Sequence, residues 1–317
     1  MDSRKVRLEK QEKLDKQRAL KWRQEIQRIE NKPFDVSFVL DEEAILRERW
    51  QIMHDQVIAS AEYWTLVRAL TPDDAREYGV KIVKINSIPN QFREYYKNKL
   101  KNRLKTRQSL KNTKFFNIRQ SYVTNDGKVY IFFDLMGHKT FLHKNLKNYP
   151  NESREIKTKM WAKTIAEGLS FLHNMGIAFG HNLNLENLVV DNRDALKLFG
   201  LDWFHSCYTT SGVKSLCELS DSSSQYLPPE AIKSKHEEIC CDIFRFGVII
   251  YYLLTDSFPF TESQDSKSLE QQIVSKTWDN GKVTNTQCKH LLNTIFVVDP
   301  VMRSTIDEIL QNQWFKI

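Results

Sequence analysis

Residues 177–191 read Ile-Ala-Phe-Gly-His-Asn-Leu-Asn-Leu-Glu-Asn-Leu-Val-Val-Asp. Before this stretch, Ile156–His173 carries apolar residues at the three- and four-residue spacing of an amphipathic helix. After it, Leu188–Asp191 and Leu196–Phe199 have the length and composition of short strands. The stretch therefore predicts an asparagine-rich polar loop that joins a helix to a pair of strands.

Four more segments follow this loop along the chain. They are Tyr226-Leu227-Pro228-Pro229-Glu230, Cys241-Asp242-Ile243-Phe244-Arg245-Phe246-Gly247-Val248-Ile249, Asp299-Pro300-Val301-Met302-Arg303-Ser304-Thr305 and Gln313-Trp314-Phe315. As an ordered set they resemble the C-terminal motifs of eukaryotic protein kinases, and the resemblance covers roughly 45–317. It implies an α+β, two-lobed fold with a small β-rich lobe and a large helical lobe.

Local patterns agree with this architecture. Two β-rich runs, Trp64–Leu70 and Gly79–Ile85, are separated by a turn, and Asn125-Asp126-Gly127 is a strong hairpin signal between Ile118–Val123 and Lys128–Leu135. Further helices are expected near 91–110, 242–255, 266–276, 286–296 and 304–312. We therefore expect a charged helical extension at 1–40, a kinase-like N-lobe at 41–136 and a kinase-like C-lobe at 137–317.

The bulk composition excludes several classes of protein. With 317 residues, 41% of them hydrophobic, the chain can bury a large core. It has no run of 18 apolar residues, and its N-terminus lacks the apolar core of a secretory signal. The five cysteines fit no metal spacing and suit reduced thiols in the cytosol or nucleus.

The net charge of +7 is concentrated in two segments. Residues 95–125 hold nine Lys or Arg and no Asp or Glu, whereas residues 1–30 hold ten basic and six acidic residues. The first segment is either a solvated helix or a site for an acidic protein surface, with nucleic acid as a third alternative. The second is either a solvated helix or a helix that docks on a partner through Trp22, Ile26 and Ile29.

The kinase resemblance assigns structural roles to three retained residues. Glu230 and Arg303 would form the buried ion pair that ties the activation segment to the C-lobe. Asp242 would hold the backbone of the catalytic loop from below. These are positions of the scaffold, so they favour the fold and not turnover.

The catalytic loop itself departs from the family pattern. Protein kinases read His-Arg-Asp-Leu-Lys-x-x-Asn here. Counting back from Asn187, the triplet becomes Gly180, His181 and Asn182, and the lysine becomes Asn184. Only the metal-binding asparagine is kept, as Asn187. An amide at Asn182 can donate a hydrogen bond but cannot accept the substrate's proton.

The metal-binding aspartate is also missing. Its position, thirteen residues after the loop asparagine, falls on Gly200, within Gly200-Leu201-Asp202. An alternative register with a deletion places Leu198 there, before Phe199-Gly200. Both registers lose the carboxylate, and Asp202 could reach a metal only through an unusual loop conformation.

The nucleotide-binding elements of the N-lobe are degenerate too. No glycine precedes Gly79, and the glycine-loop frame falls on Ala59, Ala61, Trp64 and Leu66. We predict Lys84 as the strand lysine, with Ile82 in place of the usual alanine and Phe133 before the hinge. Its expected helix partner, nineteen residues on, is Arg103 and not a glutamate.

These losses together predict a catalytically inactive pseudokinase that acts as a scaffold or regulator through protein binding. We expect no cofactor, with Lys84 and Asn187 as remnants of the ATP and Mg²⁺ positions. The expected partners have acidic surfaces, a cytoskeletal assembly among them, and the expected location is the cytoplasm. Two stretches, Asp126-Gly127-Lys128-Val129-Tyr130-Ile131 and Leu-Glu-Asn-Leu-Val-Val-Asp at 185–191, resemble the calcium/calmodulin-dependent or testis-specific kinases. The alternatives are a divergent Ser/Thr kinase and a non-catalytic ATP-binding switch.

Overall fold

A computed structural model describes residues 3–30, 36–39, 41–47, 50–61, 63–72, 74–88, 110, 112–135, 140–142, 146–200, 205–209, 211–215, 217–218, 224–234, 236–260, 269–275 and 278–316. The helix predicted near 91–110, and with it most of the basic segment 95–125, lies outside these residues. Among the helices within them, none is both long enough and apolar enough to cross a membrane.

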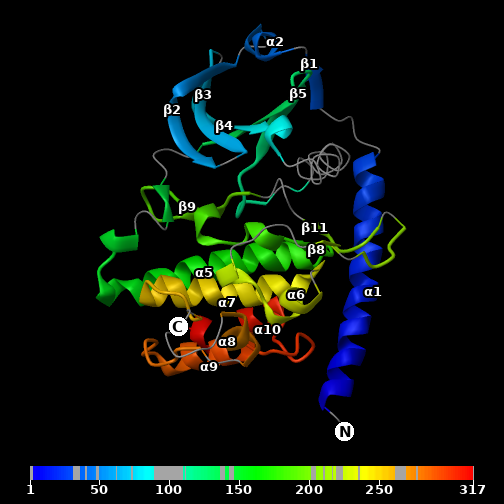
Figure 1. The fold of residues 1–317 in the computed structure, drawn as a ribbon, viewed down its shortest axis with the longest axis vertical. Coiled ribbons are helices and arrows are strands. Elements are labelled where there is room, and N and C mark those ends of the chain that lie inside the picture. Colours follow the sequence, from blue (N-terminus) through cyan, green and yellow to red (C-terminus); the bar gives the residue numbers. More distant parts are fainter. Residues whose placement is uncertain are drawn as a thin grey trace. The chain divides into compact units, whose positions relative to one another are not determined.

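The chain divides into two compact units, which we call the helical unit and the sheet unit. The helical unit comprises residues 1–26, 140–190 and 195–317, and the sheet unit comprises 27–139 and 191–194. The first 26 residues therefore group with the C-terminal helices, whereas the sequence suggested a separate extension at 1–40. Figure 1 shows both units as ribbons.

The sheet unit is built on six strands in the order β1-β5-β6-β4-β3-β2. All neighbours are antiparallel except β1 and β5, which are parallel. The strands are β1 (Val36–Val39), β2 (Gln51–Ala61), β3 (Trp64–Thr71), β4 (Asp74–Lys84), β5 (Ile118–Thr124) and β6 (Lys128–Asp134), and helix α2 spans Glu42–Arg47.

The predicted hairpin is confirmed as β5 and β6. Its turn needs a glycine for two reasons. Gly127 has a φ of +80°, and a Cβ there would lie 2.6 Å from the side-chain nitrogen of Asn86. The Gly127 N–H donates to the carbonyl of Thr124 at 3.0 Å, which closes the turn.

The two faces of β4 bury different side chains, because successive residues of a strand point to opposite faces. Tyr78, Val80 and Ile82 pack into a core cluster around Trp50, whose ring stacks on Phe132 at 4.1 Å. Gly79, Lys81 and Val83 lie on the other face. This alternation decides which lysine of the strand is buried.

The helical unit is centred on two long helices, α5 (Asn151–His173) and α7 (Ile239–Thr255), which pack on each other. The central part of α7 is buried on every side. The helical unit also contains the shorter helices α6 (Pro229–Ser234), α8 (Leu269–Ser275), α9 (Thr286–Ile295) and α10 (Ile306–Leu310). Its short strands are β7 (Thr140–Phe141), β8 (Ile177–Ala178), β9 (Leu188–Val190), β10 (Leu196–Leu198), β11 (His205–Ser206), β12 (Cys217–Glu218) and β13 (His236–Glu237). The helices predicted near 242–255, 286–296 and 304–312 are confirmed.

Helix α1 (Ser3–Glu30) runs beside the helical unit in Figure 1. Trp22 and Ile29 are only 4% and 3% exposed, and Ile26 is half-buried. The burial of Trp22 contradicts the interpretation of this segment as a freely solvated helix, whereas docking on a partner protein stays a prediction. The helix docks within its own chain.

Candidate functional site

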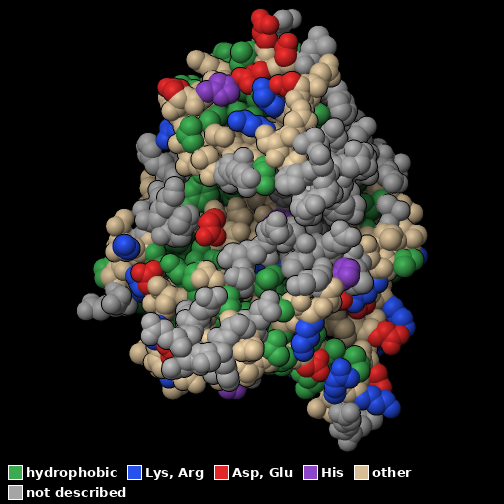
Figure 2. All heavy atoms as spheres, viewed as in Figure 1, with side chains coloured by type: hydrophobic (Ala, Val, Ile, Leu, Met, Phe, Trp, Pro, Cys, Tyr) green, Lys and Arg blue, Asp and Glu red, His purple; other side chains and the backbone are tan. Residues whose placement is uncertain are grey.

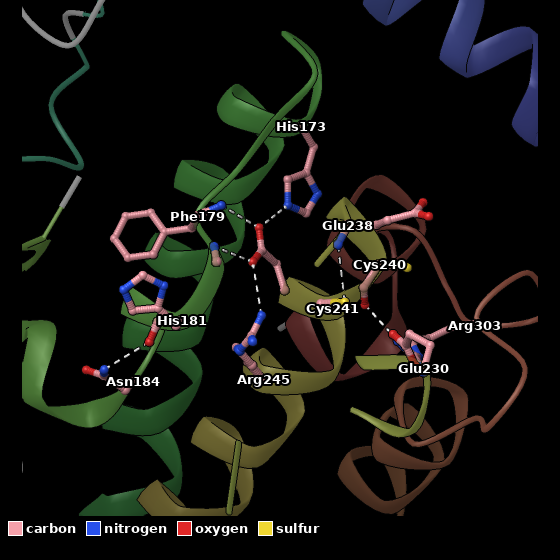
Figure 3. A network of polar contacts seen from close by, with 12 residues as sticks. His173, Phe179, His181, Asn184, Glu230, Glu238, Cys240, Cys241, Arg245 and Arg303 are labelled. Atoms are coloured by element: carbon pink, nitrogen blue, oxygen red, sulfur yellow. Dashed lines mark hydrogen bonds and ion pairs between the residues drawn. The ribbon is translucent and has the colours of Figure 1, made fainter. Parts of the chain in front are cut away.

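The loop at 177–191 is fixed from below by a buried carboxylate. Asp242 on α7 is fully buried, and its Oδ2 accepts the Phe179 N–H at 2.7 Å and pairs with His173 Nε2 at 2.9 Å. Its Oδ1 accepts the Gly180 N–H at 2.8 Å. Figure 3 shows Phe179 and His173 converging on this carboxylate. The retained aspartate thus sets the path of the loop, in the place that the resemblance implied.

Two short 3₁₀ turns, Gly180–Asn182 and Leu185–Asn187, shape the loop between β8 and β9. Gly180 has a φ of +74°, in the left-handed region that glycine tolerates best. Between the turns, the Leu185 N–H donates to the hydroxyl of Tyr226 at 3.3 Å. Tyr226 therefore connects the loop to the segment that precedes α6, a role the sequence did not indicate.

The degenerate catalytic positions are joined by hydrogen bonds from side-chain amides to backbone carbonyls. Asn187 Nδ2 donates to the Asn182 carbonyl at 2.9 Å, and Asn182 Nδ2 donates to the Gly200 carbonyl at 2.7 Å. The Phe199 N–H in turn donates to the Asn187 carbonyl at 2.8 Å. The positions of the base, the loop asparagine and the metal ligand thus form one hydrogen-bonded unit of neutral groups.

The space over Gly200 is taken by Asn187. Gly200 has a φ of +93°, and a Cβ there would lie 3.1–3.2 Å from three atoms of the Asn187 side chain. An L-residue at this position would be strained by its backbone conformation as well as crowded. The local conformation is therefore adapted to having no side chain at the predicted metal position.

The alternative register, which places Leu198 at the metal position, provides no carboxylate there either. Leu198 is 1% exposed and Phe199 is 4% exposed, and the Phe199 ring meets Phe141 edge to face at 6.3 Å. Both side chains belong to the apolar interior of the helical unit. Asp202 lies outside the described residues, so its position carries no argument.

Asn184, at the position of the loop lysine, is held by the loop itself. Its Nδ2 donates to the carbonyl of His181 at 3.1 Å. Its Oδ1 is buried and accepts no hydrogen bond within the described part of the chain. This position therefore carries a neutral amide that is directed into the protein.

Glu230 and Arg303 are brought together as a two-pronged ion pair. The two guanidinium nitrogens lie 2.5 and 2.8 Å from the two oxygens of Glu230, and they also donate to the carbonyls of Cys240 and Val297. Burial alone would lower the pKa of Arg303, but Glu230 more than offsets it, so that pKa is raised. The pair ties α6 to the start of α7 and to the segment before α10.

Glu230 also lies near two thiols. The ligand atoms of Glu230, Cys240 and Cys241 are within 4.8 Å of one another. However, Glu230 is engaged by Arg303, and the Cys241 sulfur accepts the Glu238 N–H at 3.3 Å. A hydrogen bond with Cys240 and burial raise the pKa of the Cys241 thiol. Because metals bind the thiolate, these conditions disfavour a metal here.

In the sheet unit, the buried lysine of β4 is Lys81 and not Lys84. Lys84 is exposed at the strand end, and its even register puts it on the face of Val80 and Ile82. Lys81 is 4% exposed, and its Nζ lies 4.8 Å from the centre of the Trp64 ring. A check of the two-residue period could have found this lysine, since Lys81 and Lys84 necessarily point to opposite faces.

The register based on Lys81 changes the neighbouring assignments. Gly79, two residues before Lys81, then takes the position of the family's alanine, and Ile82 belongs to the core cluster on the opposite face. A Cβ at Gly79 would lie 2.3 Å from Leu135 Cδ1 and 2.7 Å from Phe133 Cε2. Side chains of this chain therefore fill the space over Gly79.

The predicted helix residue Arg103 lies outside the described residues. The predicted glycine-loop frame falls on the hairpin of β2 and β3: Ala59 and Ala61 lie on β2, and Trp64 and Leu66 lie on β3. The backbone pairs closely through this hairpin, with Ala61 opposite Trp64 and Ala59 opposite Leu66.

Comparison with known proteins gives one family. A family model described as the protein kinase domain matches residues 53–315. Serine/threonine-protein kinase SRK2D of Arabidopsis thaliana is 28% identical over 167 residues, which are 51% of this chain and 45% of that protein. Protein kinase kin1 of Schizosaccharomyces pombe is 23% identical over 199 residues, 62% of this chain and 21% of that protein. The matches therefore span less than half the length of these relatives.

Proposed function

The chain belongs to the protein kinase domain family, and we propose that it is a catalytically inactive member that acts by binding other proteins. The observation that carries this proposal is the closed unit of Asn182, Asn187 and Gly200. In an active kinase these positions supply a base and metal ligands, two of them as carboxylates. Here they supply amides, a carbonyl and no charge.

The number of catalytic groups that are missing together supports inactivity more than any single substitution does. Removal of a general base alone costs about 10²–10⁴ in rate. Charge neutralisation by metal ions and cations provides most of the catalysis of phosphoryl transfer. The positions of the base, the metal aspartate and the loop lysine are all uncharged, as Asn182, Gly200 and Asn184.

The sheet unit supports weak or absent nucleotide binding. We assign the position of the strand lysine to Lys81, and its ammonium lies over the Trp64 indole. The position of the alanine is Gly79, whose free face is filled by Phe133 and Leu135. ATP would have to displace these side chains before it could pack against this strand.

The hydrogen bonds of Asp242 and the ion pair of Glu230 and Arg303 support a role in which the folded domain binds partners. Asp242 and the pair of Glu230 and Arg303 keep the catalytic loop and α6 in place without taking part in chemistry. We propose partners with acidic surfaces, recruited through the basic segments 95–125 and 1–30, with a cytoskeletal assembly as one candidate and nucleic acid disfavoured. A cytoplasmic location belongs to the same proposal, as does a kinship with calcium/calmodulin-dependent or testis-specific kinases.

A transfer assay tests the proposal directly. The full-length chain, with Mg²⁺ or Mn²⁺ and γ-labelled ATP, should label neither itself nor a generic protein substrate above the level of its Lys81→Ala variant. Labelling that this variant abolishes would establish the rival function, a divergent Ser/Thr kinase.

A second candidate, a nucleotide-binding switch without turnover, is favoured only by the survival of Lys81 and Asn187. Bound nucleotide at 100 times its Kd would add about 2.7 kcal/mol to the free energy of unfolding. The melting temperature should therefore rise clearly with millimolar ATP if the switch exists. We expect no rise, either with Mg²⁺ or without it.

A further inference from the structure

Helix α1 has one face turned toward the helical unit. Arg18 and Trp22 are only 7% and 4% exposed. The partly buried residues follow the same three- and four-residue spacing: Arg7, Gln11, Leu14, Asp15, Ala19, Glu25 and Ile26. The outer face carries interspersed acidic and basic side chains, visible at the lower right of Figure 2. The inner face is thus a specific contact.

The N-terminal part of α1 is attached to the helical unit by ion pairs. Arg4 Nε lies 2.8 Å from Asp299 Oδ2, and Lys10 Nζ lies 2.7 Å from Glu308 Oε1. Arg7 Nη1 lies 3.5 Å from Glu308 Oε2. Two acidic residues that flank Arg303 in sequence therefore receive three cations from successive turns of the helix. We call this set the clasp.

Further along its length, α1 contacts the turn at 205–215, which is the first described segment after Gly200. The Tyr208 hydroxyl donates to Asp15 Oδ1 at 3.1 Å. Gly212 lies under Arg23, since a Cβ at Gly212 would be 2.3 Å from Arg23 Nε. Gly176 similarly admits the Tyr208 ring, with Arg18 Cβ 3.6 Å from where its own Cβ would be. Gly212 thus lets Arg23 of α1 approach the turn closely, and Gly176 lets the Tyr208 ring approach the segment before β8.

The turn is itself ordered by its own backbone. The Thr209 N–H donates to the Val213 carbonyl, and the Gly212 N–H donates to the Thr209 carbonyl, both at 2.8 Å. The Cys207 N–H donates to the Gly176 carbonyl at 2.9 Å. The turn therefore lies between the loop that precedes β8 and the inner face of α1.

From these contacts we propose that this face of the helical unit is a docking surface for a basic helix, and that α1 is its resident ligand and acts as a latch on the 205–215 turn. The acidic pair Asp299 and Glu308 binds cations at one end, and the turn contacts Asp15 and Arg23 at the other. Arg4 and Arg23 are about 28 Å apart at 1.5 Å per residue. Because a helix is stiff over this length, release of the clasp loosens the turn as well.

The test uses the full-length chain and exposed positions, so that folding is not at risk. Arg4→Glu with Lys10→Glu reverses both strong clasp cations. The matched control, Lys5→Glu with Lys13→Glu, makes the same change of charge at exposed positions of the same helix. Hydrogen exchange is measured by mass spectrometry for the peptides that cover 12–23 and 205–215.

We expect exchange in both peptides to be about tenfold faster in the clasp variant and unchanged in the control. Arg4→Glu combined with Asp299→Arg should restore most of the protection lost in Arg4→Glu alone. Faster exchange in 12–23 with unchanged exchange in 205–215 would overturn the latch, since the helix would then fray without acting on the turn. Equal exchange in the clasp variant and the wild type would overturn the docking surface itself.

Discussion

The amide of Asn182 donates to the carbonyl of Gly200 at 2.7 Å. This bond joins the position of the catalytic base to the position of the metal ligand. It requires an N–H donor at residue 182, which a carboxylate does not have. An asparagine at the position of the family's base therefore supplies a hydrogen bond that the present conformation uses.

Asn182→Asp is consequently expected to destabilise the protein and, under the proposed function, to give no phosphoryl transfer. At pH 7 the new carboxylate would face the Gly200 carbonyl, and the loss of the bond should lower the free energy of unfolding by about 1–3 kcal/mol. The cost should shrink as the pH falls from about 6 to 4 and be small below about pH 4, where aspartate is protonated in both states and can donate again. Urea unfolding measures it, with the exposed Asn280→Asp as the control for charge.

Gly200→Ala should also be costly, because its backbone has a φ of +93° and Asn187 crowds the new Cβ. We expect a loss of about 1–3 kcal/mol in unfolding free energy, of which the left-handed backbone accounts for about 1–2. Combination with Asn187→Ala should recover the part due to crowding. Equal stability of Gly200→Ala and the wild type would show that this segment readily takes another conformation.

Much of the helical unit could be predicted from its sequence. The motifs around Glu230, Asp242 and Arg303 are close to helix ends with clear apolar periodicity, so both the elements and the chemistry of the ion pair were visible. The network of Asn182, Asn187 and Gly200 was not, because hydrogen bonds between a side chain and a distant carbonyl leave no pattern in the sequence.

The strand lysine of β4 and the buried face of α1 were harder to predict, for physical reasons. A match to the family motif points to Lys84, whereas the two-residue alternation of β4 puts Lys81 on the face of Gly79. The inner face of α1 includes the buried Arg18, since a long aliphatic stem can be buried even though its residue counts as charged. Periodicity arguments that consider only apolar residues miss such faces.

The two lysines of β4 should therefore differ in their effects. Lys81→Ala removes a buried side chain that packs on Trp64, so we expect a loss of about 1–2 kcal/mol in unfolding free energy. Lys84→Ala, at an exposed strand end, should stay within about 0.5 kcal/mol of the wild type. Chemical denaturation of both variants checks this, and a larger effect of Lys84→Ala would return the strand lysine to its sequence-predicted position.

Arg303→Ala should be among the most damaging single changes. It would leave Glu230, which is 16% exposed at its side chain, without its partner, along with the carbonyls of Cys240 and Val297. Breaking a buried pair costs about 3–5 kcal/mol. Arg303→Lys should recover little, because an ammonium cannot bind in two prongs. Exposed Arg193→Ala is the control in the same unfolding experiment.

The clasp of α1 should weaken in acid. Arg4 lowers the pKa of Asp299, and at Glu308 the opposing effect of burial is outweighed by Lys10, so that its pKa is lowered as well. Carboxylates whose pKa is lowered on docking stabilise the docked state above their ordinary values of 3.8 and 4.5, and lose that contribution as the pH falls through the lowered values. The wild type should therefore lose its stability advantage over Arg4→Gln with Lys10→Gln between pH 6 and 3.

That advantage is small, because all four side chains are about a third or more exposed. Exposed pairs contribute about 0.2–1 kcal/mol each, so the two variants should differ by about 0.5–2 kcal/mol at pH 6 and low salt. At 1 M salt, where the screening length is about 3 Å, the difference should be largely lost even at pH 6. A difference that persists in both acid and high salt would mean that Arg4 and Lys10 act through the packing of their stems and not through charge, and the clasp would then not respond to pH at all.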